Sequence, residues 1–153
     1  MIHTTDKKRE EIVSTLDGLI AILEDGKLGY TNAAEHIESP ALKTEFLTYA
    51  RERALFIVEL QDEINRLGKS TDTSGGGALG AMHRVWIDIK AAFTSGDNEA
   101  IIDACITGED AAIEKYEMAL KEEELEASQT ALISKQLNTI KNTLLKIKSR
   151  KLS

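Results

Sequence analysis

The amino-acid sequence predicts an all-α protein that folds as one elongated bundle of long helices. The 153 residues are 42% hydrophobic and 29% charged, with one proline and few aromatic side chains, which is the usage of a helical protein. Apolar residues recur at helical spacing over long stretches, so each helix has one apolar stripe that must be buried against the others. A chain of this length suits one domain. We therefore expect residues 1–153 to form a single unit.

Two long helices are predicted in the first half of the chain. The first begins near Thr5, whose hydroxyl can cap it, and its stripe contains Ile12, Leu16, Ile20, Leu23, Tyr30, Ala34 and Ile37. Ser39 and Pro40 then form an N-cap followed by a first-turn proline, a strong signal for the start of a helix. The second stripe contains Leu42, Phe46, Tyr49, Phe56, Leu60, Ile64 and Leu67. Gly68 provides the stop signal for this helix.

The third arm of the bundle is predicted to be split into two helices. Residues 69–77 lack apolar groups and contain three consecutive glycines, which favours a flexible connection across the end of the bundle. A short helix then carries Leu79, Met82, Val85, Trp86, Ile89 and Phe93. The pattern breaks at residues 94–98 and resumes through Ile102, Cys105, Ala112, Tyr116 and Leu120. After the acidic run 121–124, a last helix carries Ile133, Leu137, Ile140, Leu144 and Ile147.

Charge and hydropathy exclude several classes of function. A net charge of -7 argues against a nucleic-acid binder, which needs a cationic face to neutralise phosphates. No window approaches the roughly 20 apolar residues of a membrane span, and the charged N-terminal residues include no signal-peptide stretch. We therefore expect a cytoplasmic protein with no membrane span. Cys105, the single cysteine, lies among isoleucines, which favours a buried, inert thiol over a redox centre.

Several short motifs resemble a bacterial family of ferritin-like four-helix-bundle proteins of unknown function. They are Ala33-Ala34-Glu35-His36, Ser39-Pro40-Ala41-Leu42-Lys43, Glu52-Arg53-Ala54, and Ser74-Gly75 with Gly80-Ala81-Met82-His83-Arg84-Val85-Trp86. The resemblance covers residues 11–150, and the glycine loop leading into His83 and Trp86 is its most specific part. It implies a ferritin-like four-helix bundle and a stress-associated bacterial setting, and it implies no particular reaction.

Ferritin-like di-iron sites use a glutamate on two helices and a Glu-x-x-His pair on the other two, because this spacing puts both ligands on one face. Neither His36 nor His83 has a carboxylate three or four residues away. By the resemblance, the second-helix motif falls at residues 52–55, where Leu55 stands in the place of the histidine. The fourth helix offers Gln136 and Thr139 instead of the ligand pair. The alternative is a carboxylate-only site for a hard cation, drawn from Glu24, Asp25, Glu52 and Glu109.

Each long helix places one polar residue within its apolar stripe. These residues are Lys27, Arg53, Glu109 and Gln136. An isolated buried charge costs several kcal/mol, so these groups must pair or reach solvent. One interpretation is that Lys27 and Arg53 bend outward at the edges of their stripes. The other is that a side-chain cation replaces the lost metal ions as the partner of Glu109, with Arg53 favoured because its fork satisfies both carboxylate oxygens.

A second candidate site follows the glycine loop. His83, Arg84 and Trp86 put a planar donor fork beside an aromatic surface, which suits a ligand or protein partner. The structural alternative is that Trp86 plugs the end of the bundle while Arg84 caps carbonyls. The basic C-terminal segment, from Lys135 to Lys151, suits hydrated side chains at the negative end of a helix dipole, or an anionic lipid or acidic partner.

Two classes of function remain. The first is a non-catalytic bundle without a cofactor, which acts through self-association, with a homodimer favoured, or through contact with a protein partner. The second is a metal-binding or di-iron oxidase-type protein with a carboxylate-only site. The missing histidine ligands favour the first class, and analogy at the level of the fold favours the second.

Overall fold

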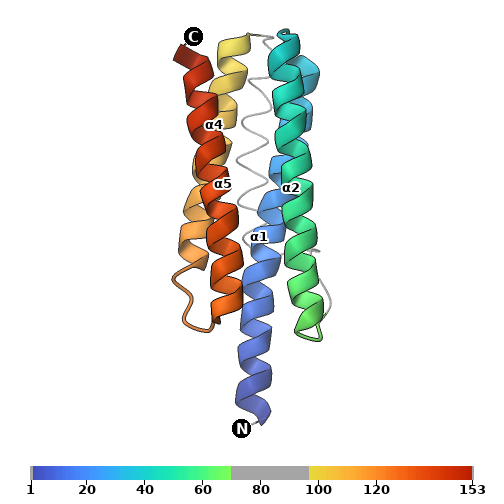
Figure 1. Cartoon of the computed structure of the whole chain (residues 1–153), viewed down its shortest axis with the longest axis vertical. Helices are drawn as coiled ribbons and strands as arrows, with labels where there is room; N and C mark the ends of the chain where they lie inside the picture. The colour runs from blue at the N-terminus through green and yellow to red at the C-terminus, as the bar shows by residue number, and fades with distance from the viewer. Residues whose placement is uncertain (1, 70–96, 153) are drawn as a thin grey trace.

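A computed structural model of the chain describes residues 2–69 and 97–152, including the side chains of residues 6–69 and 97–151. Four helices, α1 (Ile2–His36), α2 (Pro40–Arg66), α4 (Asn98–Ala119) and α5 (Ala127–Leu152), lie alongside one another in an elongated bundle (Figure 1). The all-α bundle predicted from the helical periodicity is confirmed. The short helix predicted between Leu79 and Phe93, and with it the split of the third arm, lies outside the described residues.

The order of the helices around the bundle sets what can meet in its centre. α1 packs against α2 and α4, α5 packs against α4 and touches α2, and no backbone contact joins α2 to α4. The helices α2 and α4 therefore lie diagonally across the bundle. They also run in the same direction, because α4 begins at the end of the bundle where α2 begins (Figure 1). The last described residue after α2 and the first before α4 therefore lie at opposite ends of the bundle.

Local sequence signals fix both ends of α2. The Ser39 hydroxyl oxygen accepts a hydrogen bond from the Leu42 amide at 3.3 Å, and Pro40 occupies the first turn. At the other end Gly68 has a φ of 79°. Its amide donates to the Asn65 carbonyl at 2.9 Å and the Lys69 amide donates to the Ile64 carbonyl at 3.2 Å, which is a Schellman motif. The predicted start and stop of this helix are confirmed.

The starts of α4 and α5 are also capped by side chains. The Asp97 carboxylate accepts a hydrogen bond from the Glu99 amide at 3.1 Å. The Gln129 side-chain oxygen accepts one from the Glu126 amide at 2.8 Å, as the third helical residue does in a capping box. These bonds satisfy amides that have no partner within the helix.

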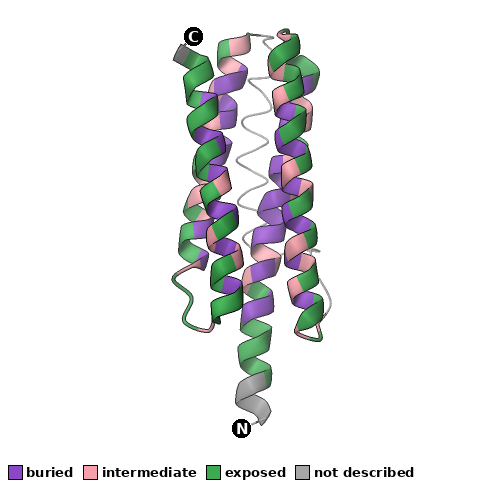
Figure 2. Cartoon of the chain, in the orientation of Figure 1, coloured by how far each residue is buried: buried purple, intermediate pink, exposed green. Residues whose placement is uncertain are grey.

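The core is a column of apolar side chains along the inner faces of the four helices (Figure 2). Its members match the predicted stripes, with Ile12, Leu16, Ile20 and Leu23 on α1, Phe46, Leu60 and Ile64 on α2, Ile102 and Ala112 on α4, and Ile133, Ile140 and Ile147 on α5. None of the described helices has the length and apolarity needed to span a membrane. Among the described residues, a few polar side chains are also buried in this column.

Candidate functional site: a polar layer in the bundle core

Arg53 lies on the inner face of α2 and is 2% exposed. Its guanidinium carbon stands 5.7 Å from the centre of the Tyr30 ring and 6.0 Å from that of Phe56. A Cβ added at Gly26 would come within 3.9 Å of the Arg53 side chain, so the α1 backbone passes close to it at this glycine. Aromatic faces attract a desolvated guanidinium, and these rings therefore offset part of the cost of burying it.

Glu109 on α4 is the partner of this guanidinium. It is 1% exposed, and its Oε2 accepts a hydrogen bond from Nη2 of Arg53. The Tyr30 hydroxyl also interacts with this carboxylate. Burial raises the pKa of Glu109 above its usual value, while the nearby Arg53 charge and the Tyr30 hydroxyl oppose that rise. The pKa of Arg53 is raised as well, since the attraction of Glu109 and other nearby groups outweighs the effect of burial.

Gln136 adds α5 to this layer. Its side-chain oxygen accepts a hydrogen bond from the Tyr116 hydroxyl at 2.8 Å. Its amide nitrogen donates to the Phe56 carbonyl at 3.3 Å and to a Glu59 carboxylate oxygen at 3.0 Å. We define the polar core layer as Tyr30, Arg53, Glu109, Tyr116 and Gln136. It takes side chains from all four described helices.

The edge of the layer is formed by a second carboxylate on α2. The Glu52 Oε1 lies 3.8 Å from Nη1 of Arg53 and accepts a hydrogen bond from the Thr143 hydroxyl of α5 at 3.4 Å. Among the described residues, Nη1 of Arg53 has no hydrogen bond that meets the usual geometry. The guanidinium is therefore hydrogen-bonded more strongly on the Glu109 side.

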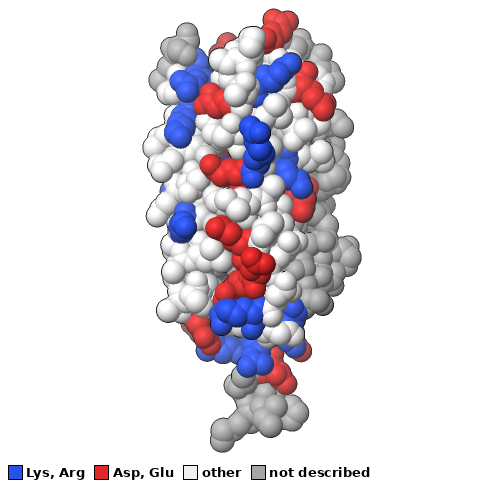
Figure 3. Space-filling model, turned by 45° about the vertical axis from the view of Figure 1, so that its right-hand side comes forward, with Lys and Arg blue, Asp and Glu red and all other residues white. Residues whose placement is uncertain are grey.

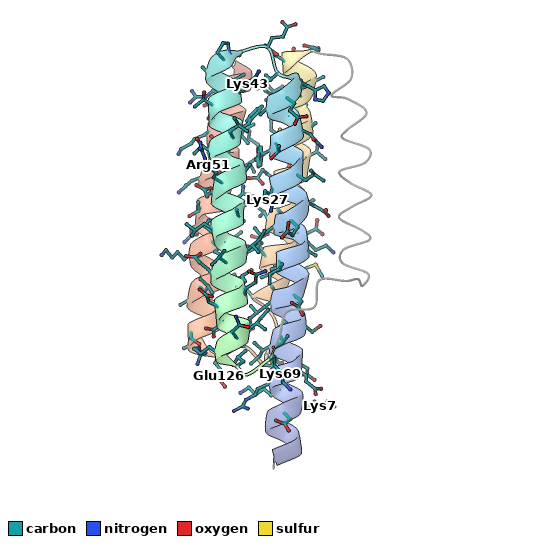
Figure 4. The ribbon with its side chains drawn as sticks, turned by 90° about the vertical axis from the view of Figure 1, so that its right-hand side faces the viewer. Lys7, Lys27, Lys43, Arg51, Lys69 and Glu126 are labelled. Carbon is teal, nitrogen blue, oxygen red and sulfur yellow. The ribbon has the colours of Figure 1, made fainter. Side chains whose placement is uncertain are left out.

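Lys27 was expected in this layer, and the structure corrects that expectation. Its side chain is 42% exposed, and its ammonium lies 3.3 Å from Glu24 on the same helix, at the surface of α1 beside α2 (Figure 4). A long flexible side chain at the edge of a stripe can carry its charge to water. The residue that α1 does contribute is Tyr30, one turn further on. The helical period assigned Tyr30 and Tyr116 to the apolar stripes, so it identified their positions and missed the role of their hydroxyls.

The residues that could have formed a carboxylate-only metal site do not come together. The Glu24 carboxylate pairs with the Lys27 ammonium, and the Glu109 carboxylate pairs with the Arg53 guanidinium. Within residues 6–69 and 97–151, no group of three or more His, Cys, Asp and Glu side chains could hold a metal ion. Asp25 is buried on α1 and Glu52 is partly exposed on α2. A guanidinium beside the central carboxylate does not fit a di-metal centre.

The position assigned to a lost histidine ligand is also corrected. Leu55 is 57% exposed and lies on the outer face of α2, two residues beyond Arg53, which points inward. A histidine there would point away from the core. Of the second candidate site, His83, Arg84 and Trp86 lie outside the described residues.

The basic residues of α5 pair with acidic residues more than the sequence suggested. Arg150 Nε lies 3.0 Å from Glu45 of α2, and Lys151 Nζ lies 2.7 Å from Asp103 of α4. Lys141 Nζ lies 3.4 Å from Oε2 of Glu117 on α4. These pairs tie the last helix to its neighbours, and they could not be found in the sequence because the partners are far apart along the chain.

Comparisons with known proteins agree with this architecture. A family described as "Domain of unknown function (DUF2383)" matches residues 11–122. The chain belongs to this family. A mutant of Mycobacterium smegmatis Dps1 has a similar structure, with a TM-score of 0.77 and 14% sequence identity over 95% of this chain and 98% of that one. No curated protein matches the sequence. The ferritin-like resemblance inferred from the motifs is confirmed, and at this identity the structural likeness concerns the fold alone.

Proposed function

We propose that this protein is a non-catalytic ferritin-like bundle that acts through self-association or contact with a protein partner. One observation carries the proposal, namely that the Arg53 guanidinium is bonded to Glu109 in the centre of the bundle. A fixed positive charge beside the central carboxylate repels a metal cation and occupies the lone pairs that would bind it. The bundle then has no described group suited to iron chemistry.

The setting follows from the resemblance and from composition. We propose a cytoplasmic protein in a stress-associated bacterial context, for which the family resemblance is the support. Self-association is supported by exposed apolar side chains on the outer faces of the helices, among them Leu55 and Val58. Most oligomers of a single chain are symmetric, and the two-fold dimer is the commonest form.

Metal analysis tests the first half of the proposal. The full chain, purified without chelator and then incubated with ferrous iron, should contain no stoichiometric iron, manganese or zinc and should oxidise iron no faster than buffer. Two metal ions per chain would contradict the proposal. The Glu109→Gln variant, analysed in parallel, separates the explanations of such a result, since a metal lost with this carboxylate is bound in the core.

Sedimentation velocity tests the second half. We expect wild-type protein to sediment as a dimer or larger species at micromolar concentration. Sedimentation at the mass of the 16.8 kDa chain up to high micromolar concentration would contradict self-association, and contact with a different protein would then be the surviving form of the proposal.

A further inference from the structure

The outer face of α2 has an apolar stripe that no described residue covers. Leu47, Leu55 and Val58 are 39%, 57% and 49% exposed. They are three of the six large apolar side chains that are exposed in the described part of the chain. Their spacing places them along one face of the helix. Burying such side chains is favourable by roughly 25 cal/mol per Å², so this face is suited to an interface.

Charged residues at helical spacing flank the stripe. Arg51 lies one turn before Leu55, and Asp62 lies one turn after Val58. Arg51 projects from the outer side of α2 (Figure 4), and neither charge forms an ion pair with a described residue. On the side of the molecule that Figure 3 shows, acidic and basic groups lie beside one another along the length of the bundle, with uncharged surface around them. We call Arg51, Leu55, Val58 and Asp62 the α2 outer face.

This arrangement is complementary to itself. Arg51 and Asp62 stand about 16 Å apart along the helix, at 1.5 Å per residue, so they cannot pair within one chain. Their midpoint lies between Phe56 and Ile57. A two-fold axis there, perpendicular to α2, places Arg51 opposite Asp62 of a second copy at both ends. The same operation sets Leu55 against Val58 of that copy in the centre.

We propose that the α2 outer face binds a second copy of this chain, with the two α2 helices antiparallel. The proposal rests on the self-association proposed above and specifies its surface. Each of the two symmetric ion pairs would flank a central group of four aliphatic side chains, as in an isologous interface. A nucleic acid or an anionic lipid surface would instead need a face of one positive sign, whereas this face carries one charge of each sign.

Charge exchange is the test, with sedimentation velocity of the full chain as the measurement. In Arg51→Asp protein each contact sets two acids together, and in Asp62→Arg protein it sets two arginines together. We expect each variant to dimerise at least tenfold more weakly than wild type. The double variant Arg51→Asp/Asp62→Arg restores both pairs with exchanged signs and should dimerise within a few-fold of wild type.

Mixing the two single variants tests the symmetry directly. The Arg51→Asp chain has an acid at both ends of the face, and the Asp62→Arg chain has an arginine at both ends. Both contacts between the two different chains are therefore favourable, and heterodimers should form from two weakly associating proteins.

Three further substitutions test the apolar centre and provide two matched controls, one for charge and one for the apolar centre. Lys43→Asp makes the same change of charge on α2 outside the proposed contact and should dimerise as wild type does. Val58→Asp should weaken the dimer, whereas Met118→Asp, at an exposed position of α4, should not.

The outcomes distinguish this inference from the proposed function. Dimeric wild-type protein whose Arg51→Asp, Asp62→Arg and Val58→Asp variants stay dimeric would overturn the α2 outer face and leave self-association standing. Monomeric wild-type protein would overturn both. Helicity measured by circular dichroism for every variant ensures that a loss of dimer is not a loss of fold.

Discussion

Arg53 and Glu109 join the two helices that lie diagonally across the bundle, α2 and α4, which have no backbone contact with each other. Both side chains are almost completely buried. The pair therefore crosses the centre of the molecule and does not reinforce a neighbouring helix contact. Different helices act on its two ends, since Tyr30 of α1 interacts with the carboxylate and Glu52 of α2 lies beside the guanidinium.

Removing one member of this pair should be costly, and removing both should cost much less. Glu109→Ala leaves an arginine charge buried without its partner, and we expect a loss of about 3 to 5 kcal/mol in the free energy of unfolding. The double variant Arg53→Met/Glu109→Leu should recover much of this loss, because both desolvation costs disappear. Denaturant unfolding of the single and double variants measures the effect. A nearly neutral Glu109→Ala variant would show that the pair does not have this role.

The partner single variant should behave differently, because only one of the two groups can lose its charge. In Arg53→Met protein, Glu109 can take up a proton, whereas Arg53 in Glu109→Ala protein stays charged. Burial already raises the pKa of Glu109, and Arg53 is the main group opposing that rise. We therefore expect Arg53→Met to destabilise the protein less than Glu109→Ala near pH 5.

The same variant should lose stability as the pH rises. A carboxyl whose folded-state pKa is raised contributes stability that is fully present below its unfolded pKa and lost as the pH increases through the folded pKa. Unfolding of Arg53→Met protein should become easier between about pH 5 and pH 8. Arg53→Met/Glu109→Gln protein is the control, since it lacks this carboxyl and should lack the additional slope. Parallel pH profiles for the two variants would contradict the assignment to Glu109.

The helical period identified the polar core layer in part. It located Arg53, Glu109 and Gln136 because a charge or amide within an apolar stripe stands out. It failed for Lys27, since the period gives the direction of Cβ and says nothing of where a flexible four-carbon chain carries its ammonium. The hydroxyls of Tyr30 and Tyr116 were missed because a tyrosine in a stripe has the appearance of any aromatic core residue.

The ends of α2 were predictable because their signals are local. Ser39 and Gly68 act on backbone groups within a few residues, so their roles can be derived from sequence alone. Ion pairs such as Arg150 with Glu45, 105 residues apart, depend on which helices are neighbours, and that order is set by packing. The exposed position of Leu55 was misjudged for a related reason, because the resemblance aligned a motif without fixing which face of the helix it occupies.

Cys105 should react only when the protein unfolds. It is fully buried on α4, and burial together with the nearby Glu109 charge raises the pKa of its thiol far above the usual value. Since the thiolate is the reactive species, a disulfide reagent at pH 8 should label native protein very slowly and denatured protein at the rate of an ordinary thiol. Labelling of native protein within seconds would show that this part of α4 opens readily. Cys105→Ala protein gives the background of the assay.

Two glycines offer a matched pair of substitutions with opposite expected signs. Gly26 lies within α1, and an added Cβ would meet the Arg53 side chain at an ordinary van der Waals distance of 3.9 to 4.0 Å. Gly26→Ala should therefore stabilise the protein by about 0.5 to 1 kcal/mol, because alanine loses less backbone entropy in a helix.

Gly68 has space around it but an unfavourable backbone angle for any other residue. Nothing lies within 4 Å of the Cβ that alanine would add, yet its φ of 79° is left-handed. Gly68→Ala should cost about 1 to 2 kcal/mol, since an L-residue is strained in this conformation and the Schellman bonds depend on it. Thermal and denaturant unfolding of both variants measures the two shifts. If Gly68→Ala also stabilised the protein, the strain at Gly68 would have to be relieved by a change in the end of α2. The amide exchange rates of Gly68 and Lys69 would reveal such a change.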